Sequence, residues 1–164
     1  MTRVDVERYR TTLQRIVELQ QQKDFEGALQ AIDELLIEAP YASALHVRRA
    51  MLLQLSPVAH PLEEVERALE HACALDESNT NALLELAHFL DAVRDRPSQA
   101  LSSFTAVAAL ASSALKDALL GSARCFIELG EHAAANDVLR EANRYFPADP
   151  DVVLLCAELT DSTP

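Results

Sequence analysis

The sequence predicts an all-α protein built from repeated helix pairs, and three observations lead to this prediction. First, one pattern of small and large apolar residues occurs four times, at spacings of 34 to 37 residues. Second, the 164-residue chain has no Trp and only 5% aromatic residues, so Leu, Ala, Val and Ile have to form its core. Third, three glycines leave little room for β-turns or phosphate-binding loops.

The clearest copy of the pattern lies between Leu119 and Pro147. Its first helix is indicated by residues on one face, at Leu119, Ser122, Ala123 and Phe126. Gly130 then supplies a residue suited to the left-handed turn that ends a helix. A second helix is indicated by Ala135, Leu139 and Ala142. Pro147 ends the copy, because proline lacks the N–H group that a helix needs.

Equivalent positions in the copies carry similar residues. The first core position of the second helices holds Ala28, Val65, Ala100 and Ala135. The large residue that follows is Ile32, Leu69, Phe104 and Leu139. The first helices share Ala50, Ala87 and Ala123. The last position of each copy holds Pro40, Glu77, Ser112 and Pro147, so two copies lack the proline. Unequal spacings imply insertions at SPVAH, before Pro61, and of about one residue near Arg96.

These residues resemble the tetratricopeptide repeat (TPR), which runs W-x2-L-G-x2-Y, then A-x3-F, then P over about 34 residues. The fourth copy matches with L119-x2-S-A-x2-F, A135-x3-L and P147, and the third with L83-x2-L-A-x2-L and A100-x3-F. The resemblance covers Tyr9 to Thr160. It implies a right-handed superhelix, an α-solenoid of about four TPR-like helix pairs plus a C-terminal capping helix. Four aligned copies disfavour an unrelated helical bundle.

We therefore expect one TPR-like domain over residues 1–164. Its repeats span about 9–42, 43–79, 80–115 and 116–149, and the capping helix about 150–160. The expected helices begin at Val4, Phe25, Ala42, Pro61, Asn79, Pro97 or Ser98, Leu115, Glu131, and Asp149 or Pro150. The sixth is expected to end near Ala111, although the segment AVAALASSAL is poorly punctuated by turn residues.

Charge and composition narrow the class of partner. The net charge is −12, with seven Lys/Arg against eight Asp/Glu in residues 1–60 and seven against eighteen in residues 61–164. The negative electrostatic potential of such a surface disfavours binding to nucleic acids and to anionic membranes. It leaves open the binding of a basic partner to the C-terminal half. The N-terminus resembles no signal peptide, and no uninterrupted apolar run reaches 18 residues, so no membrane insertion is expected. We expect a cytoplasmic protein.

The cysteines and the search for catalytic motifs indicate neither a metal, nor a cofactor, nor an enzyme. Cys73, Cys125 and Cys156 are far apart, as in reduced thiols rather than zinc ligands. His88 and Asp91 share a helix face, but such a pair is mostly a surface contact. The sequence contains no P-loop, GxSxG, HExxH or GxGxxG motif. We expect no catalysis, no metal and no cofactor.

The resemblance implies a concave surface lined by the first helix of each pair. Helical phase places there Arg10, Gln14, Val17, Gln21, Val47, Arg48, Met51, Gln54, Leu84, Glu85, His88, Asp91, Asp117, Leu120, Arg124 and Ile127. We predict that a peptide or protein segment binds at Gln14, Val17, Arg48, Met51, Leu84, Glu85, His88, Arg124 and Ile127. Val17, Met51 and Leu84 would anchor it, and Arg48, Glu85 and Arg124 would orient it.

Some TPR domains hold a C-terminal carboxylate of a chaperone between Lys, Asn and Arg side chains. The corresponding positions here are Leu13 and Val17, Arg48, and Asn81 and Glu85, which keep one cation and add an acid. An EEVD-type ligand is therefore not expected.

The function favoured by the sequence is a non-catalytic adaptor that binds a protein or peptide in the groove. One alternative is a small acidic secretion-type chaperone for a partner protein, which shares its size and charge. The other is a self-assembling structural protein, a homodimer through the C-terminal helix, because Leu154, Leu155 and Cys156 are apolar on more than one face.

Overall fold

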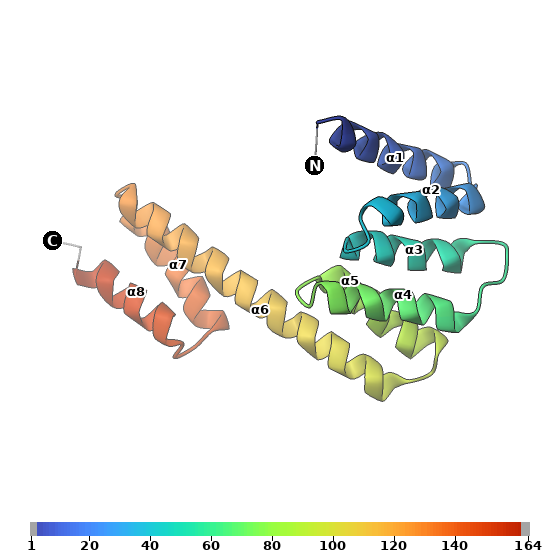
Figure 1. Cartoon of the computed structure of the whole chain (residues 1–164). Helices are drawn as coiled ribbons and strands as arrows, with labels where there is room; N and C mark the ends of the chain where they lie inside the picture. Colours follow the sequence, from blue (N-terminus) through green and yellow to red (C-terminus); the bar gives the residue numbers. More distant parts are fainter. Residues whose placement is uncertain (1–2, 162–164) are drawn as a thin grey trace. The chain divides into compact units, whose positions relative to one another are not determined.

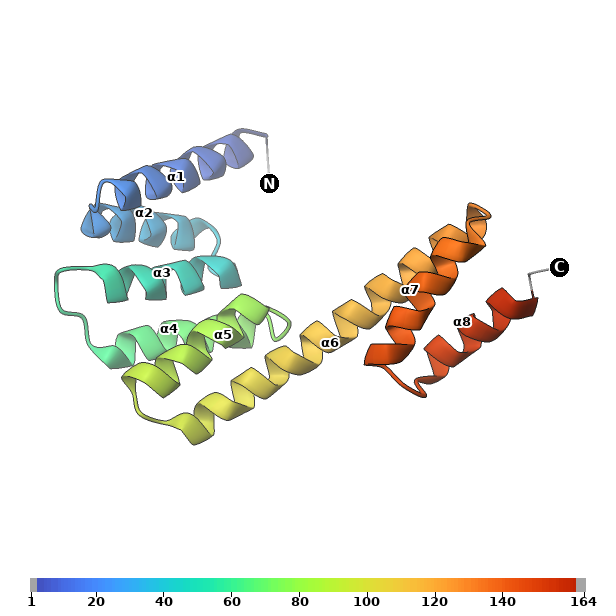
Figure 2. The ribbon, with the colours of Figure 1, turned by 180° about the vertical axis from the view of Figure 1, so that it is seen from behind.

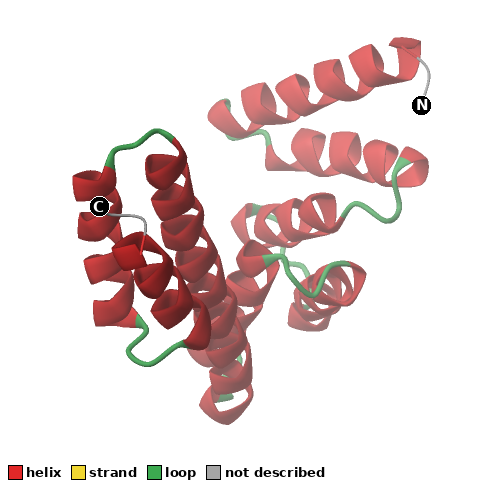
Figure 3. Ribbon diagram, turned by 90° about the vertical axis from the view of Figure 1, so that its left-hand side faces the viewer, coloured by secondary structure: helices red, strands yellow, loops and turns green. Residues whose placement is uncertain are grey.

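The computed structural model describes the backbone of residues 3–161 and the side chains of residues 6–159. All regular structure in the described chain is helical (Figure 3). The helices are α1 (Arg3–Gln21), α2 (Phe25–Glu38), α3 (Ser43–Leu55), α4 (Leu62–Leu75), α5 (Thr80–His88), the π-helix η1 (Phe89–Val93), α6 (Pro97–Glu128), α7 (His132–Tyr145) and α8 (Pro150–Asp161).

The described chain divides into two compact units. Unit 1 ends at Val107 and unit 2 begins at Ala108, so α6 contributes to both. In unit 1, helices α1 to α4 pack with their neighbours in the chain, and α5 packs on α4 (Figures 1 and 2). This is the stacking that repeated amphipathic helix pairs produce, because each pair buries its apolar face on the next.

The core of unit 1 consists of the positions that recur in the sequence pattern. Ala28, Ile32, Val65, Leu69 and Ala100 are all buried in one cluster. Ile16, Leu35, Leu45, Leu52, Leu53, Phe89 and Leu90 join them. The small residues let the helices approach closely, and the large ones fill the space beside them.

Polar side chains fix the turns between the helices. The carboxylate of Asp24 caps α2 by accepting from the amide of Gly27 at 2.9 Å. Asn79 caps α5 by accepting from the amide of Ala82 at 3.1 Å, and its Nδ2 donates to the Ser43 hydroxyl at 2.8 Å. That buried hydroxyl donates to the carbonyl of Ala72 at 2.8 Å, which ties α3 to the end of α4.

The π-helix accounts for the insertion expected near Arg96. The amide of Arg94 donates to the carbonyl of Phe89, five residues earlier, at 3.1 Å. A π turn takes up one more residue than an α turn without breaking the helix. The third copy is one residue longer than the fourth between Ala87 and Ala100, and η1 absorbs that residue.

Helix α6 contradicts one sequence expectation. We expected separate helices, ending near Ala111 and starting near Leu115, but Pro97–Glu128 is one helix of 32 residues. Two punctuating residues are missing. Ser112 replaces the proline of Pro40 and Pro147, and the position of the capping Asn79 holds Leu115. Leu, Ala, Ser and Lys all tolerate a helix interior, so nothing stops the helix there.

Unit 2 packs α7 and α8 with the second half of α6. Its core contains Leu120, Ala123, Ala135, Leu139, Ala142, Val152, Leu155 and Leu159. The Lys116 ammonium contacts the carboxylates of Asp149 at 3.0 Å and Asp151 at 3.2 Å, joining α6 to the start of α8. Asp149 also accepts from the amides of Asp151 and Val152, as a helix cap does.

One helix of the described part, α6, is long and apolar enough to cross a membrane by length and composition. Its most apolar window has a mean hydropathy of 1.3, and 6% of that window is buried. However, Ala100 of α6 lies in the core of unit 1, and Leu120 and Ala123 lie in the core of unit 2. Helix α6 is therefore part of two packed cores.

Candidate partner-binding surface

The first-helix face of unit 1 is the surface of α1, α3 and α5 that the sequence predicts to bind a partner. Gln14, Val17, Met51 and His88 are exposed there, and Arg48, Leu84 and Glu85 are half-buried. In unit 2, Arg124 of α6 is exposed and Ile127 is half-buried. Every residue of the predicted site thus remains reachable by solvent.

Two other groove positions proposed from helical phase are wrong. Val47 is buried in a cluster with Ala72 and Ala82, and Leu120 is buried in the core of unit 2. Each lies one turn before a predicted contact residue, Met51 or Arg124, but its side chain packs against neighbouring helices instead. The helical periodicity of a sequence tells which face of a helix a residue lies on. It does not tell how much of that face a neighbouring helix covers.

Two apolar residues on the first-helix face keep much of their surface in water. Val17 on α1 is 39% exposed and Met51 on α3 is 37% exposed. They belong to successive first helices of one compact unit. The flexible Met side chain can adapt its shape to different ligands. Covering Val17 and Met51 with an apolar group would remove their apolar surface from water and so favour binding.

The polar residues of this face are already held by neighbours. The Arg48 guanidinium donates to the side-chain carbonyl of Gln20, across α3 and α1. The His88 ring packs edge-on against Phe104, with centroids 5.2 Å apart. Such contacts reduce the rotamer entropy that binding a ligand would cost.

Unit 1 has two hollows on what we call its second-helix side, lined mostly by α2 and α4, with His46, Arg49 and Leu53 of α3 and His60 of the loop. One of about 650 Å³ is lined by Leu36, His46, Arg49, Glu64, Arg67, Ala68, Glu70, His71 and Ala74. Another of about 610 Å³ is lined by Glu26, Gly27, Leu29, Gln30, Asp33, Glu34, Ile37, Arg49, Leu53, His60 and Glu64. No residue of the predicted groove lines either hollow. The sequence reading overlooked this side, although the SPVAH insertion that ends at His60 lies there.

Arg49 lines both hollows and forms ion pairs with two carboxylates. Its guanidinium contacts Asp33 and Glu64, each at 2.7 Å. Burial alone would lower the pKa of Arg49, but the hydrogen bonds that its guanidinium donates to Asp33 and Glu64 outweigh burial and raise the pKa. The His46 and His71 rings meet edge-to-face, 4.6 Å apart, in the first hollow.

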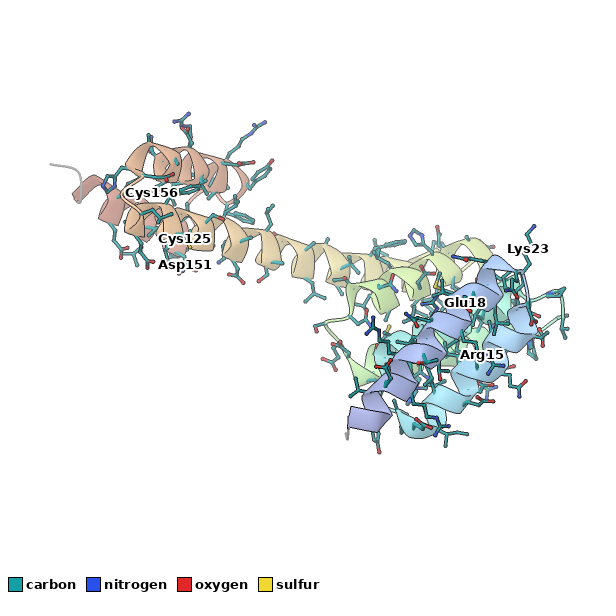
Figure 4. All side chains as sticks on the ribbon, turned by 90° about the horizontal axis from the view of Figure 1, so that it is seen from above. Arg15, Glu18, Lys23, Cys125, Asp151 and Cys156 are labelled. Atoms are coloured by element: carbon teal, nitrogen blue, oxygen red, sulfur yellow. The ribbon has the colours of Figure 1, made fainter. Side chains whose placement is uncertain are left out.

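The His, Cys, Asp and Glu side chains of the described chain do not gather into a metal-binding cluster. Within residues 6–159, no group of three or more His, Cys, Asp or Glu could hold a metal ion. Burial, followed by the charge of Glu70, raises the pKa of the Cys73 thiol and makes it less reactive. Cys125 on α6 is exposed and Cys156 on α8 is half-buried, both in unit 2 (Figure 4).

Comparison with solved structures identifies the fold. The crystal structure of PilW, described as a widely conserved type IV pilus biogenesis factor, superposes with a TM-score of 0.57 at 17% identity, over 98% of this chain and 70% of that one. The crystal structure of MamA superposes with a TM-score of 0.54 at 15% identity, over 93% of this chain and 81% of that one. Both are TPR proteins.

The fold class follows from these superpositions. The chain has an all-helical, TPR-like fold, which confirms the fold predicted from the sequence.

Sequence comparison shows similarity to a bacterial protein. An uncharacterized 18.1 kDa protein in the carS 3' region of Myxococcus xanthus is 30% identical over 107 residues. The match covers 63% of this chain, and the chain spans 63% of that relative's length. No protein-family profile matches the sequence.

Proposed function

We propose that this chain is a non-catalytic scaffold or adaptor that holds a peptide or protein segment against the first-helix face of unit 1. One observation carries the proposal: Val17 and Met51 stay more than a third exposed on successive first helices of a fold whose relatives bind proteins. A segment laid across α1 and α3 would cover both side chains. Its affinity would come from these apolar contacts.

Charge indicates how the segment is oriented. Arg48 lies on the same helix as Met51, while Glu85 lies on α5. A segment with an acidic group near one end and a basic group near the other would match Arg48 and Glu85 in turn. Arg124 and Ile127, which the sequence also predicts as contact residues, belong to unit 2.

The experiment is an affinity capture from the native lysate followed by binding measurements on purified variants. Arg48→Glu combined with Met51→Ala should weaken binding of the captured partner about a hundredfold, because it removes an anchor and reverses a charge. Circular dichroism should show unchanged helicity, because Met51 is exposed and Arg48 is half-buried.

A matched control carries the same kinds of substitution on the second-helix side. Ile37→Ala combined with Arg67→Glu alters two exposed residues beside the hollows of α2 and α4. This control should bind as the wild type does. If it loses the partner while the Arg48 and Met51 variant keeps it, the binding surface lies on the second-helix side and the proposal is wrong.

A secretion-type chaperone is the second candidate, and the acidic character of residues 61–164 favours it. Those residues hold seven Lys/Arg against eighteen Asp/Glu, a net charge of −11. The captured partner separates the two functions: an adaptor holds a folded protein, whereas a chaperone holds an unfolded, exported client. The cytoplasmic location stays a prediction from the sequence.

A further inference from the structure

One of the two hollows on the second-helix side of unit 1 has unbalanced charge. We call it the α2 hollow, because most of its lining comes from α2, and its volume is about 610 Å³. Ligand pockets of proteins commonly measure about 300–1,000 Å³, so this hollow has room for a large side chain. Its described lining has four carboxylates and one guanidinium, a net formal charge of −3 when His60 is neutral: Glu26, Asp33, Glu34, Glu64 and Arg49.

The guanidinium of the α2 hollow is already bound to two of these carboxylates. Arg49 donates to Asp33 and to Glu64, each at 2.7 Å. Glu26 accepts from the Ser56 hydroxyl, which brings no charge. No Lys or Arg of the described chain pairs with Glu26 or Glu34. Two exposed negative charges at this hollow therefore lack a counter-charge.

The excess of negative charge is local to the α2 hollow. The other hollow, which we call the His46 hollow, has Arg49 and Arg67 against Glu64 and Glu70, so its formal charge is balanced when its histidines are neutral. Residues 1–60 as a whole are nearly balanced, with seven Lys/Arg against eight Asp/Glu. The charge of the α2 hollow is therefore not a simple consequence of an acidic chain.

The α2 hollow combines this charge with an apolar floor. Leu29 of α2 is 6% exposed and Leu53 of α3 is 4% exposed, and both line the hollow. Glu26 and Glu34 are eight residues apart on α2, about 12 Å along the helix axis. An apolar floor between carboxylates suits a side chain with an aliphatic stem and a cationic end.

His60 supplies a second, independent indication of a ligand. Its buried Nε2 has no hydrogen-bond partner among the described residues. It lies 3.7 Å from Glu26 Oε1, too far for a hydrogen bond, and Nδ1 lies 4.0 Å from Glu64 Oε2. Buried nitrogens are normally paired. With the ring proton on Nδ1, toward Glu64, Nε2 can accept from a donor that enters beside the half-exposed Glu26.

We propose that the α2 hollow binds a basic segment of a partner protein, with an arginine side chain lying in the hollow. The aliphatic stem covers Leu29 and Leu53, and the guanidinium donates to Glu26 and His60. A second basic residue of the segment meets Glu34. Arginine fits better than lysine, because its planar group donates in several directions at once and is more weakly hydrated than an ammonium group.

This surface is separate from the first-helix face. No residue predicted to contact a ligand on that face lines the α2 hollow. The inference therefore does not depend on the proposed function, and the chain could hold one partner on each side of unit 1.

Fluorescence anisotropy with a labelled peptide of alternating arginine and alanine tests the pairing, at physiological salt. The wild-type chain should bind this peptide about tenfold more tightly than the same peptide with citrulline in place of arginine, because citrulline keeps the shape and lacks the charge. Glu34→Lys should weaken binding of the arginine peptide about tenfold. Equal affinity for the two peptides would overturn the proposal.

Glu70→Lys is the matched control. Glu70 is exposed like Glu34 and the substitution changes the net charge by the same amount, but Glu70 lines the His46 hollow. This variant should bind the arginine peptide as the wild type does, and circular dichroism should show the same helicity in all three proteins. If both substitutions weakened binding equally, the peptide would be attracted by the general charge of the chain, and the proposal would be wrong.

Histidine ring signals in NMR spectra locate the peptide. The signal of His60 should shift when the arginine peptide is added to the wild-type chain, because His60 lines the α2 hollow. Those of His46 and His71 should stay in place, because these residues line the His46 hollow. Shifts of His46 and His71 without a shift of His60 would overturn the proposal.

The Arg48→Glu and Met51→Ala variant separates this inference from the proposed function. It should bind the arginine peptide as the wild type does, because neither residue lines the α2 hollow. Loss of the arginine peptide in this variant would place the peptide on the first-helix face and contradict the α2 hollow. If the variant keeps both the arginine peptide and the captured partner, the proposed function is wrong and the α2 hollow is supported.

Discussion

At the level of single residues, two glycines of unit 2 face opposite requirements. Gly130 follows α6 with φ of 76°, whereas Gly121 lies inside that helix, and an added Cβ would meet nothing within 4 Å at either. Gly130→Ala should therefore lower the free energy of unfolding by about 1 kcal/mol through backbone strain alone. Gly121→Ala should raise it by about 0.5–1 kcal/mol. Urea unfolding of both variants checks the opposite signs.

A second residue-scale prediction concerns Glu66, which occupies the repeat position of the buried Leu29. Its side chain is 12% exposed and pairs with Arg94 at 3.1 Å and with Arg96. Glu66→Gln should lower the free energy of unfolding by about 2 kcal/mol, because two half-buried guanidinium groups lose their counter-charge. Glu63→Gln is the control, since Glu63 also pairs with Arg94 but is exposed; it should change little. If urea unfolding showed the same loss of stability for Glu66→Gln and Glu63→Gln, the burial of Glu66 would not strengthen its ion pairs.

Among the helices, α8 depends on an ionic contact with α6. The hydrogen bond from Lys116 is the main cause that lowers the pKa of Asp149, and amides of Val152 and Asp151 add to it. Because the pKa is lower in the folded state, this contribution is complete above the unfolded pKa of about 3.9 and is lost as pH falls below it. The amide protection factors of α8, corrected for the intrinsic exchange rate at each pH, should fall on acidification more than those of α4, and Asp149→Asn should reduce the difference. If the protection of α8 had the same pH dependence in the wild type and in Asp149→Asn, the contact between Lys116 and Asp149 would not stabilise α8.

Most of the helices could be predicted from the sequence, because their ends and faces depend on local residues. Pro40, Asn79 and Gly130 mark turns that the structure contains, and Ala28, Ile32 and their equivalents are buried as the repeat requires. Helix α6 was predicted wrongly because the repeat period placed a turn near residue 112. Ser112 does not end a helix and Leu115 does not cap one, so the helix continues. The burial of Val47 depends on how α4 and α5 cover α3, which no local pattern contains.

Considered as a whole molecule, the chain has two hydrophobic cores that share α6. Ile32 and Leu139 are equivalent in the repeat and fully packed, Ile32 in unit 1 and Leu139 in unit 2. Stability in repeat proteins is approximately a sum of local terms, so damage to one core should stay near that core. Sequence position alone would not distinguish the two residues.

Leu139→Ala and Ile32→Ala therefore form a matched pair, each expected to cost about 2–5 kcal/mol of local stability. Hydrogen exchange should show that Leu139→Ala lowers amide protection in α7 and α8 while α2 and α4 keep theirs. Ile32→Ala should do the reverse, because its cavity opens in the core of α2 to α4. If either substitution lowered protection in both units alike, the chain would unfold as one cooperative body, with α6 transmitting the loss from one core to the other.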